Sequence, residues 1–392
     1  MKISKKDYRI CTRGIWDSTV PGITFDEDGV SNYAKMFDKL CEVFPEDEEG
    51  KKYWENIVDK MKEKGKGRKY DCIIGVSGGT DSSYLMYIAK KEYGLRPLAV
   101  NLDNGWSSEI AVQNIKKVTK ALDIDLETYV IDYEEVKAVL RAYMKASLPW
   151  IDGPTDNAIK AVLFSIAERE KVKFVISGSD FRSEGKQPSE WTYTDSKQML
   201  SLVKKFEKIH LNTYPYQTLF DKVRSPIIKR IMDYPPLNYI EYQKITAREF
   251  LTREFNWEYY GGHHHENIFT RFAIAYWMPK KFGIDKRIIT LSAQILNGEL
   301  TREAALERMR KPPYDPDDME RDREFVIKKL DLTNEEFQRI WNQKNKYYWD
   351  YPSYMPLFKK FYKSSERFLK FFYSTPPSIL VEKDIREDEN SN

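Results

Sequence analysis

The sequence predicts an α/β protein built on a parallel sheet with helices on both faces, preceded by a small N-terminal segment and followed by a mostly helical C-terminal region. Three observations predict this fold. Short apolar runs alternate with stretches of helical periodicity between residues 69 and 234, as in β-α units. A loop rich in glycine and serine joins the first apolar run to the first helix. The length of 392 residues favours more than one structural module.

These patterns divide the chain into four expected parts. Residues 1–67 form an N-terminal segment, and residues 68–237 form the α/β domain. Residues 238–381 form the helical C-terminal region. Residues 382–392 are charged and are expected to be a disordered tail.

The N-terminal segment has the spacing of a metal site without its ligands. A hairpin turn is expected at residues 27–29 and a helix over residues 31–44. Two CxxC pairs would be a strong zinc signal, but here Cys11 is paired with Gly14 and Ser31 with Ala34. One thiolate cannot hold a structural zinc ion, so we expect no zinc site.

The α/β domain is predicted from alternating periodicities. The expected strands are residues 71–76, 97–102, 127–131 and 172–177, and the helices expected to separate them are 82–92, 108–122, 133–147 and 156–170. In such a sheet, ligands bind beyond the carboxyl ends of the strands. The loops that follow the strands are therefore where we look for a site.

The first of these loops, with the sequence SGGTDS, has the composition of a phosphate cradle. It leads from a buried strand into a helix N-terminus, where free backbone N–H groups and the helix dipole favour an anion. Asp81 would repel a phosphate unless a divalent cation lay between them, so we expect Asp81 to bind Mg²⁺. The residues expected to bind ATP and pyrophosphate here are Ser77, Gly78, Gly79, Thr80, Asp81 and Ser82. The alternative is a turn that merely caps a helix.

Polar clusters follow two other strands at the same edge of the sheet. Asp103 and Asn104 follow the second strand and are expected to contact the nucleoside of ATP. Asp180 follows the fourth strand and is expected to share the metal ion, with Glu184 near the substrate. Ordinary turn chemistry at strand ends is the alternative, because Asn, Asp and Gly are favoured there. The expected catalytic residues are Asp81, Ser82 and Asp180.

The second half of the chain contributes further candidates. Residues 185–240 are rich in loops and aromatic residues and are expected to be an insertion that covers the site. In the stretch YYGGHHHENIFTR, three adjacent histidines cannot all face one metal ion from a helix. We expect His265, Glu266 and Arg271 to reach the substrate, the alternative being a solvated turn. Helices are expected over residues 270–281, 285–297, 301–309 and 317–329.

Composition limits the possible partners. The formal net charge is +3, so nothing indicates a nucleic-acid partner, and the basic run at residues 60–70 is interpreted as a solvated linker. No signal peptide opens the sequence and no run of 18 apolar residues occurs, so we expect a cytoplasmic protein that does not insert into membranes. Three widely spaced cysteines give no disulfide framework.

With these motifs in view, the chain resembles a known family. The SGGxDS loop resembles the pyrophosphate loop (PP-loop) of the N-type ATP pyrophosphatases, whose fold is that of the adenine nucleotide alpha hydrolases. The motifs PGITFDEDGV, LDNGW, PTDNAI, YYGGHHHENIFTRF and LNGELTREAAL resemble the N-acetyl sugar amidotransferases of lipopolysaccharide and pseudaminic-acid-type biosynthesis. Relatives usually carry CxxC twice in the opening segment. Residues 1–67 therefore resemble a degenerate zinc ribbon, in which only Cys11 remains.

The resemblance implies an activity. Such enzymes convert the acetamido group of a nucleotide-activated sugar into an acetamidino group, using ATP and Mg²⁺ and releasing AMP and pyrophosphate. The residues are consistent with this chemistry, because adenylation gives a poor electrophile a good leaving group. Lys280, Lys281 or Lys286 could add positive charge near the phosphates, or could simply be solvated.

Ammonia must come from elsewhere. A glutaminase needs an activated cysteine, whereas Cys11 is internal, Cys41 follows a helical apolar pattern and Cys72 lies inside a buried strand. The resemblance implies a separate glutaminase subunit. Two alternatives remain open: another ATP pyrophosphatase, such as a tRNA thiolase or an amide synthetase, and a catalytically silent scaffold that binds nucleotide.

Overall fold

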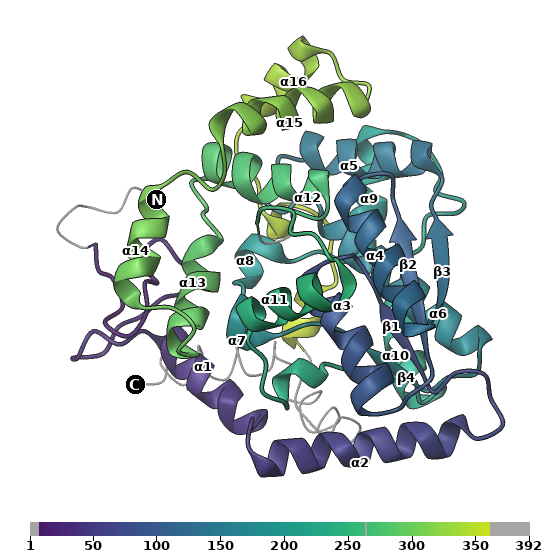
Figure 1. Cartoon of the computed structure of the whole chain (residues 1–392). Coiled ribbons are helices and arrows are strands. Elements are labelled where there is room, and N and C mark those ends of the chain that lie inside the picture. Colours follow the sequence, from purple (N-terminus) through teal and green to yellow (C-terminus); the bar gives the residue numbers. More distant parts are fainter. Residues whose placement is uncertain (1–7, 263–264, 361–392) are drawn as a thin grey trace.

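The sheet, on the right-hand side of Figure 1, is parallel throughout, as predicted. The computed structural model describes residues 8–262 and 265–360. Five strands lie in the order β3-β2-β1-β4-β5. Their bounds are β1 Cys72–Gly75, β2 Pro97–Asp103, β3 Asp125–Val130, β4 Phe174–Ile176 and β5 Met232–Tyr234. The four predicted strands are confirmed.

Side chains alternate between the two faces of the sheet, and each face is buried by different helices. On β1, Ile73 packs with Val162 and Ile166 of α6 (Gly153–Arg169). Its neighbours in β1 belong to the main core, which includes apolar residues of α3 (Thr80–Tyr87) and α4 (Glu109–Leu122). Burial on both faces explains why β1, β2 and β4 are apolar runs, whereas the edge strand β3 is largely exposed.

The remaining helices of the α/β domain follow the expected order, with additions. α3 continues as a π-helix, η1 (Ile88–Glu92), and α5 (Tyr133–Lys145) follows β3. Residues 185–240, expected to be a loop-rich cover, instead contain regular elements. These are α8 (Ser189–Thr192), α9 (Ser196–Phe206), α10 (Leu219–Ile227), β5 and the short 3₁₀ turn η2 (Pro236–Asn238).

This segment packs against the domain rather than over its site. Trp191 and Tyr214 are buried in the main core. The carboxylate of Glu135 in α5 accepts hydrogen bonds from the backbone amides of residues 212–214, which fixes the loop after α9. The expectation that residues 185–240 cover the site is therefore wrong, because their aromatic side chains complete the core.

The N-terminal segment forms the predicted turn and helix. The turn at residues 27–29 is present, with Gly29 at φ +74° and an antiparallel bridge between Phe25 and Ser31. Ser31 caps helix α1 (Asn32–Val43). Helix α2 (Glu48–Gly65) extends through the first half of the basic run at 60–70, so the interpretation of that run as a linker is wrong for residues 60–65.

The place of the missing ligands is packed with protein. A Cβ atom on Gly14 would lie 2.6 Å from the ring of Trp16, and Trp16 is itself buried. The amide of Ser31 donates to the Cys11 sulfur at 3.3 Å. Packing therefore holds the residues around Cys11 and Gly14 in place. Two hydrogen bonds join them to the C-terminal region: the Ile15 amide donates to Ser292 Oγ, and Arg302 Nε donates to the Gly14 carbonyl.

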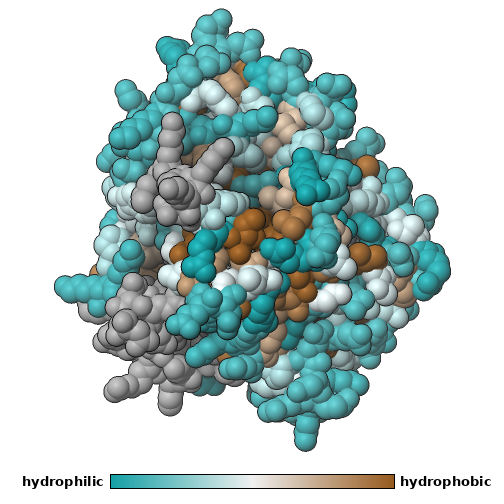
Figure 2. All heavy atoms as spheres, turned by 90° about the vertical axis from the view of Figure 1, so that its left-hand side faces the viewer, coloured by the Kyte–Doolittle hydropathy of each residue, from teal (hydrophilic) through white to brown (hydrophobic). Residues whose placement is uncertain are grey.

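The C-terminal region is helical, as predicted. Its elements are α11 (Lys244–Phe255), α12 (Ile268–Phe272), the π-helix η3 (Ala273–Phe282), α13 (Arg287–Leu296), α14 (Arg302–Arg310), α15 (Pro316–Lys329), α16 (Asn334–Trp341) and the 3₁₀ turn η4 (Tyr348–Asp350). Figure 2 views the molecule from the side of α13 and α14, where a small hydrophobic band is surrounded by hydrophilic residues. Within the described residues, no helix is long and apolar enough to cross a membrane. The predicted disordered tail, 382–392, lies outside the described residues.

Candidate active site

The SGGTDS loop lies between β1 and α3, as expected, and hydroxyl groups satisfy its amides. The Ser77 amide donates to Ser82 Oγ at 3.3 Å, and the Gly79 amide donates to Ser77 Oγ at 3.2 Å. The Thr80 amide at the start of α3 donates to the Tyr260 hydroxyl at 3.3 Å. In a phosphate cradle, amides at these positions are the donors to the anion, and here hydroxyl groups are their acceptors.

The C-terminal region holds this loop in place. The Gly78 carbonyl accepts hydrogen bonds from Trp257 Nε1 at 3.1 Å and from Asn114 Nδ2 at 3.4 Å. Asn114 also bonds both the amide and the carbonyl of Glu258. The loop is therefore clamped between α4 and the segment after α11.

Gly78 cannot carry a side chain. It adopts φ +80°, and a Cβ atom there would lie 2.2 Å from the carbonyl oxygen of Ala111. We expect Gly78→Ala to weaken binding of an ATP analogue by roughly tenfold or more, because relieving the clash moves the phosphate-binding amides. Calorimetry with the purified variant measures this. Gly94→Ala is the matched control, since Gly94 has φ +60° and nothing within 4 Å of its Cβ position. Equal binding by the Gly78 variant and the wild-type protein would contradict the cradle.

Asp81 sits in the first turn of α3 and is already paired. Lys244 Nζ donates to Asp81 Oδ2 at 2.8 Å, and the Tyr242 hydroxyl donates to Asp81 Oδ1. Burial lowers the pKa of Lys244, but attraction to Asp81 and Glu184 outweighs burial and leaves it raised. Burial and the neighbouring Asp81 raise the pKa of Tyr242, so its hydroxyl stays a donor. Lys244 is thus a firmly held cation at the PP-loop.

Two further carboxylates surround this cation. Glu184 Oε1 lies 3.8 Å from Lys244 Nζ. Asp180 is buried, and its carboxylate accepts the amides of Arg182 and Ser183, which caps helix α7 (Phe181–Glu184). Burial raises the pKa of Asp180, and repulsion from Asp81 adds to this. The structure therefore brings Asp81 and Glu184 together around Lys244, with Asp180 behind them as a helix cap.

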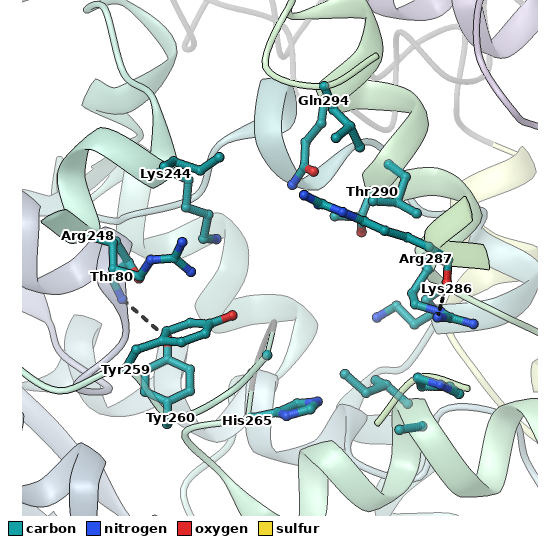
Figure 3. Close-up of a pocket in the computed structure, with 18 of the residues that line it drawn as sticks. Thr80, Lys244, Arg248, Tyr259, Tyr260, His265, Lys286, Arg287, Thr290 and Gln294 are labelled. Atoms are coloured by element: carbon teal, nitrogen blue, oxygen red, sulfur yellow. Dashed lines mark hydrogen bonds between the residues drawn. The ribbon is translucent and has the colours of Figure 1, made fainter. Parts of the chain in front are cut away.

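A cavity of about 480 Å³ opens next to the loop. Figure 3 shows Thr80, Lys244, Arg248 and Tyr259 on one wall, with Lys286, Arg287, Thr290 and Gln294 on the wall facing them. Tyr260 lies on the first wall, where its hydroxyl meets the Thr80 amide, and His265 lies between the two walls. The first wall belongs to the PP-loop and α11, and the second belongs mostly to α13.

Two of the expected substrate residues lie in this cavity. His265 is buried, with its ring 5.4 Å from the Tyr314 ring centroid. Glu266 places Oε1 3.5 Å from Ser77 Oγ. Their backbone reaches the sheet edge because the Ser108 amide donates to the Glu266 carbonyl. Their role in binding a substrate stays a prediction. His263 and His264 lie outside the described residues.

Three other expected residues point elsewhere and do not line this cavity. Arg271 forms a two-point ion pair with Asp322, at 2.6 Å for both contacts, and so joins α12 to α15. Asp103 accepts the Gly105 amide at 2.8 Å, as a turn residue does. Asn104 is buried and accepts the Trp106 amide. Arg271 and Asn104 are held by bonds within the protein, whereas Asp103 is half-buried and holds only its own turn. The expected contacts of these three residues with ATP or substrate stay predictions.

Several cavity residues had no distinguishing sequence signal. Lys244 and Arg248 lie far from the loop in sequence and belong to no short motif. The same is true of Tyr242, which donates to Asp81 but is not among the lining residues. Tyr260 lies in the stretch YYGGHHHENIFTR, where the sequence pointed only to His265, Glu266 and Arg271. Of the three lysines that the sequence offered, Lys286 lines the cavity. Lys281 instead donates to the carbonyls of Trp341 and Gln343 at the C-terminus of α16.

Two known families match different parts of the chain that reach the cavity. Residues 266–366 match the family described as LPS biosynthesis protein WbpG-like, C-terminal domain, and residues 52–187 match NAD synthase. These two matches support the resemblance to lipopolysaccharide-biosynthesis proteins of amidotransferase type within the N-type ATP pyrophosphatase superfamily. The region similar to NAD synthase contains the PP-loop, and the WbpG-like region contains α13 and α14.

The individual proteins similar to this chain match only part of it or share little sequence identity with it. An uncharacterised protein of Methanocaldococcus jannaschii, MJ1599, is 36% identical over 92 residues, so the chain spans about a third of that relative's length (32%, against 24% of this chain). NMN synthetase from Francisella tularensis is 17% identical, with a TM-score of 0.28 over 56% of this chain and 96% of that one. NH₃-dependent NAD synthetase from Campylobacter jejuni is 15% identical, with a TM-score of 0.26 over 57% and 94%.

Proposed function

We propose that the protein is an ATP-dependent amidotransferase that converts the acetamido group of a nucleotide-activated sugar into an acetamidino group during surface polysaccharide synthesis. One observation carries the proposal: the region similar to NAD synthase and the WbpG-like region line the same cavity. Ser77 of the PP-loop and Glu266 of the WbpG-like region place their side-chain oxygens 3.5 Å apart. A nucleotide at the loop and a substrate against α13 would therefore meet.

In the first half-reaction, the acetamido oxygen attacks the α-phosphorus of ATP. The bond between the α-phosphorus and the bridging oxygen breaks, and pyrophosphate leaves. The residues suited to hold it are the loop amides of Gly79 and Thr80, whose present partners are hydroxyls that a phosphate oxygen would replace. Lys244 keeps its proton and offers positive charge beside them.

The residues present also fit Mg²⁺. This ion is commonly held by one or two carboxylates together with phosphate oxygens and water, so a cage of protein ligands is not required. Among the described residues, no cluster of three or more His, Cys, Asp or Glu side chains forms such a cage. Asp81 and Glu184 already flank one cation, the ammonium group of Lys244. These two carboxylates would hold the ion, which neutralises developing phosphate charge.

In the second half-reaction, ammonia attacks the carbon of the adenylated amide. The carbon–oxygen bond breaks, AMP leaves with that oxygen, and the nitrogen releases a proton to give the amidine. Free ammonia is needed because ammonium has no lone pair. The activated carbon has to be shielded from water, which would otherwise hydrolyse it back to the amide, and a position between the two walls of the cavity limits that access.

The proposal is tested by incubating the protein with ATP, Mg²⁺, ammonium salt and a panel of nucleotide-activated acetamido sugars. AMP and a sugar in which NH replaces one oxygen, identified by mass spectrometry, are expected with at least one of them. Release of AMP only with tRNA or with a carboxylic acid acceptor would instead assign another reaction of the superfamily. No AMP with any acceptor, although ATP binds, would favour a silent scaffold.

A further inference from the structure

The cavity carries more positive charge than its own carboxylates neutralise. Six cationic and three acidic side chains line it, not counting His265. Lys244 is paired with Asp81, and Arg287 is paired with Asp285. Within the described residues, the other four cations form no ion pair or hydrogen bond through their side chains. These four are Arg248, Lys286, Arg308 and Lys311.

Three of the four lie together, on the wall away from the PP-loop. Arg287 Nη1 donates to the carbonyls of Arg308 and Lys311, at 3.1 and 3.0 Å. This side chain ties the end of α14 to the start of α13, where Lys286 stands. Lys286 lies 4.2 Å from the Trp150 ring centroid, and burial lowers its pKa. Figure 3 places Lys286 and Arg287 across the cavity from Lys244. We call Lys286, Arg308 and Lys311 the α13–α14 cations.

Helix-end chemistry alone does not account for this arrangement. Basic residues are common in the last turn of a helix because they complement its dipole. Arg310, in the same turn, does only that: it pairs with Glu307 and does not line the cavity. Arg308 and Lys311 line the cavity beside a lysine from another helix. Unpaired cations that converge on one cavity indicate a polyanionic ligand.

We propose that the α13–α14 cations bind the diphosphate of the acceptor, a nucleoside diphosphate sugar, while the PP-loop holds ATP. The identity of the acceptor rests on the proposed function. Two polyanions in one cavity repel each other, so each needs its own cations. Lys244 serves the ATP wall, and the α13–α14 cations neutralise the second diphosphate from the opposite side. This arrangement leaves the sugar between the walls, next to the α-phosphorus of ATP.

The test uses the double variant Arg308→Gln/Lys311→Gln and the matched control Arg310→Gln. Calorimetry measures binding of UDP, GDP, dTDP and farnesyl diphosphate, with and without saturating α,β-methylene ATP. We expect at least one nucleoside diphosphate to bind in the presence of the ATP analogue. The double variant should weaken that binding about tenfold or more and leave binding of the ATP analogue within about threefold. Arg310→Gln should change neither.

Other outcomes overturn the inference. Equal loss of UDP and ATP-analogue binding would assign these cations to ATP. Unchanged nucleoside diphosphate binding in the double variant, or competition with the ATP analogue, would also refute a separate subsite. Tighter binding of farnesyl diphosphate than of every nucleotide would replace the nucleoside diphosphate with a lipid-linked one. The assay involves no turnover, so the subsite can stand even if no acetamido sugar is converted.

Discussion

Replacing Asp81 by Asn is expected to slow AMP formation by about 10²-fold or more, which corresponds to about 2.7 kcal/mol or more of activation free energy. The change keeps the size of the side chain and removes the charge that faces Lys244 at 2.8 Å. It thereby removes a carboxylate suited to a metal ion and loosens the cation beside the loop. Pyrophosphate release under saturating ATP measures the effect.

Stability and metal dependence separate the two roles of Asp81. The Asp81 and Lys244 side chains are 17% and 20% exposed, so the variant should also lose about 1–3 kcal/mol of unfolding free energy. If Asp81 binds Mg²⁺, higher Mg²⁺ concentrations should partly restore activity. Asp125→Asn is the control, because Asp125 pairs with Lys69 at 3.0 Å but starts β3, away from the loop. Turnover near that of the wild-type protein would rule out both roles.

The parts of the fold that the sequence predicted are those with strong local signals. β1, β2 and β4 are buried on both faces and therefore are apolar runs that stand out. β5 was missed because it is three residues long, includes Asp233 and lies at the edge of the sheet. Its strand state comes from pairing with β4, which no local pattern encodes.

Helix α2 was missed for a different reason. Its lysine content suggested a linker, yet the buried residues follow helical spacing: Trp54, Ile57, Val58 and Met61. That spacing is the signal of an amphipathic helix, and it outweighs a run of charges that simply forms the solvated face.

In the candidate site, too, the sequence predicts residues in local motifs but not those that depend on long-range partners. The SGGTDS loop could be found because glycine and hydroxyl groups must stand at fixed positions between a strand and a helix. Lys244 could not, because its ion pair joins residues 163 positions apart and exists only after α11 packs on α3. Arg271 was assigned to substrate from its place in a polar motif, and its partner Asp322 lies 51 residues downstream. Long-range partners decide whether a polar residue serves the site or the fold.

The isolated chain is expected to use ammonium salts and not glutamine. None of its three cysteines is placed for glutamine hydrolysis: Cys11 and Cys72 are buried, and burial raises the thiol pKa of Cys72 and Cys41. A thiol with a raised pKa is a poor nucleophile near neutral pH. Activity with ammonium should rise with pH in proportion to free ammonia. We propose that a separate glutaminase subunit docks near the cavity mouth and supplies ammonia directly.

Turnover with glutamine as the sole nitrogen donor is the decisive measurement, with ammonium chloride at matched concentration as the positive control. Adding the partner should make glutamine effective at neutral pH, where free ammonia is scarce. Cys11→Ser, Cys41→Ser and Cys72→Ser should each retain ammonium-dependent activity wherever the variant folds, because no thiol takes part in the chemistry. Robust glutamine use by the isolated chain would refute the need for a partner. If one of these substitutions then abolished glutamine use but kept ammonium use, that cysteine would be the glutaminase nucleophile.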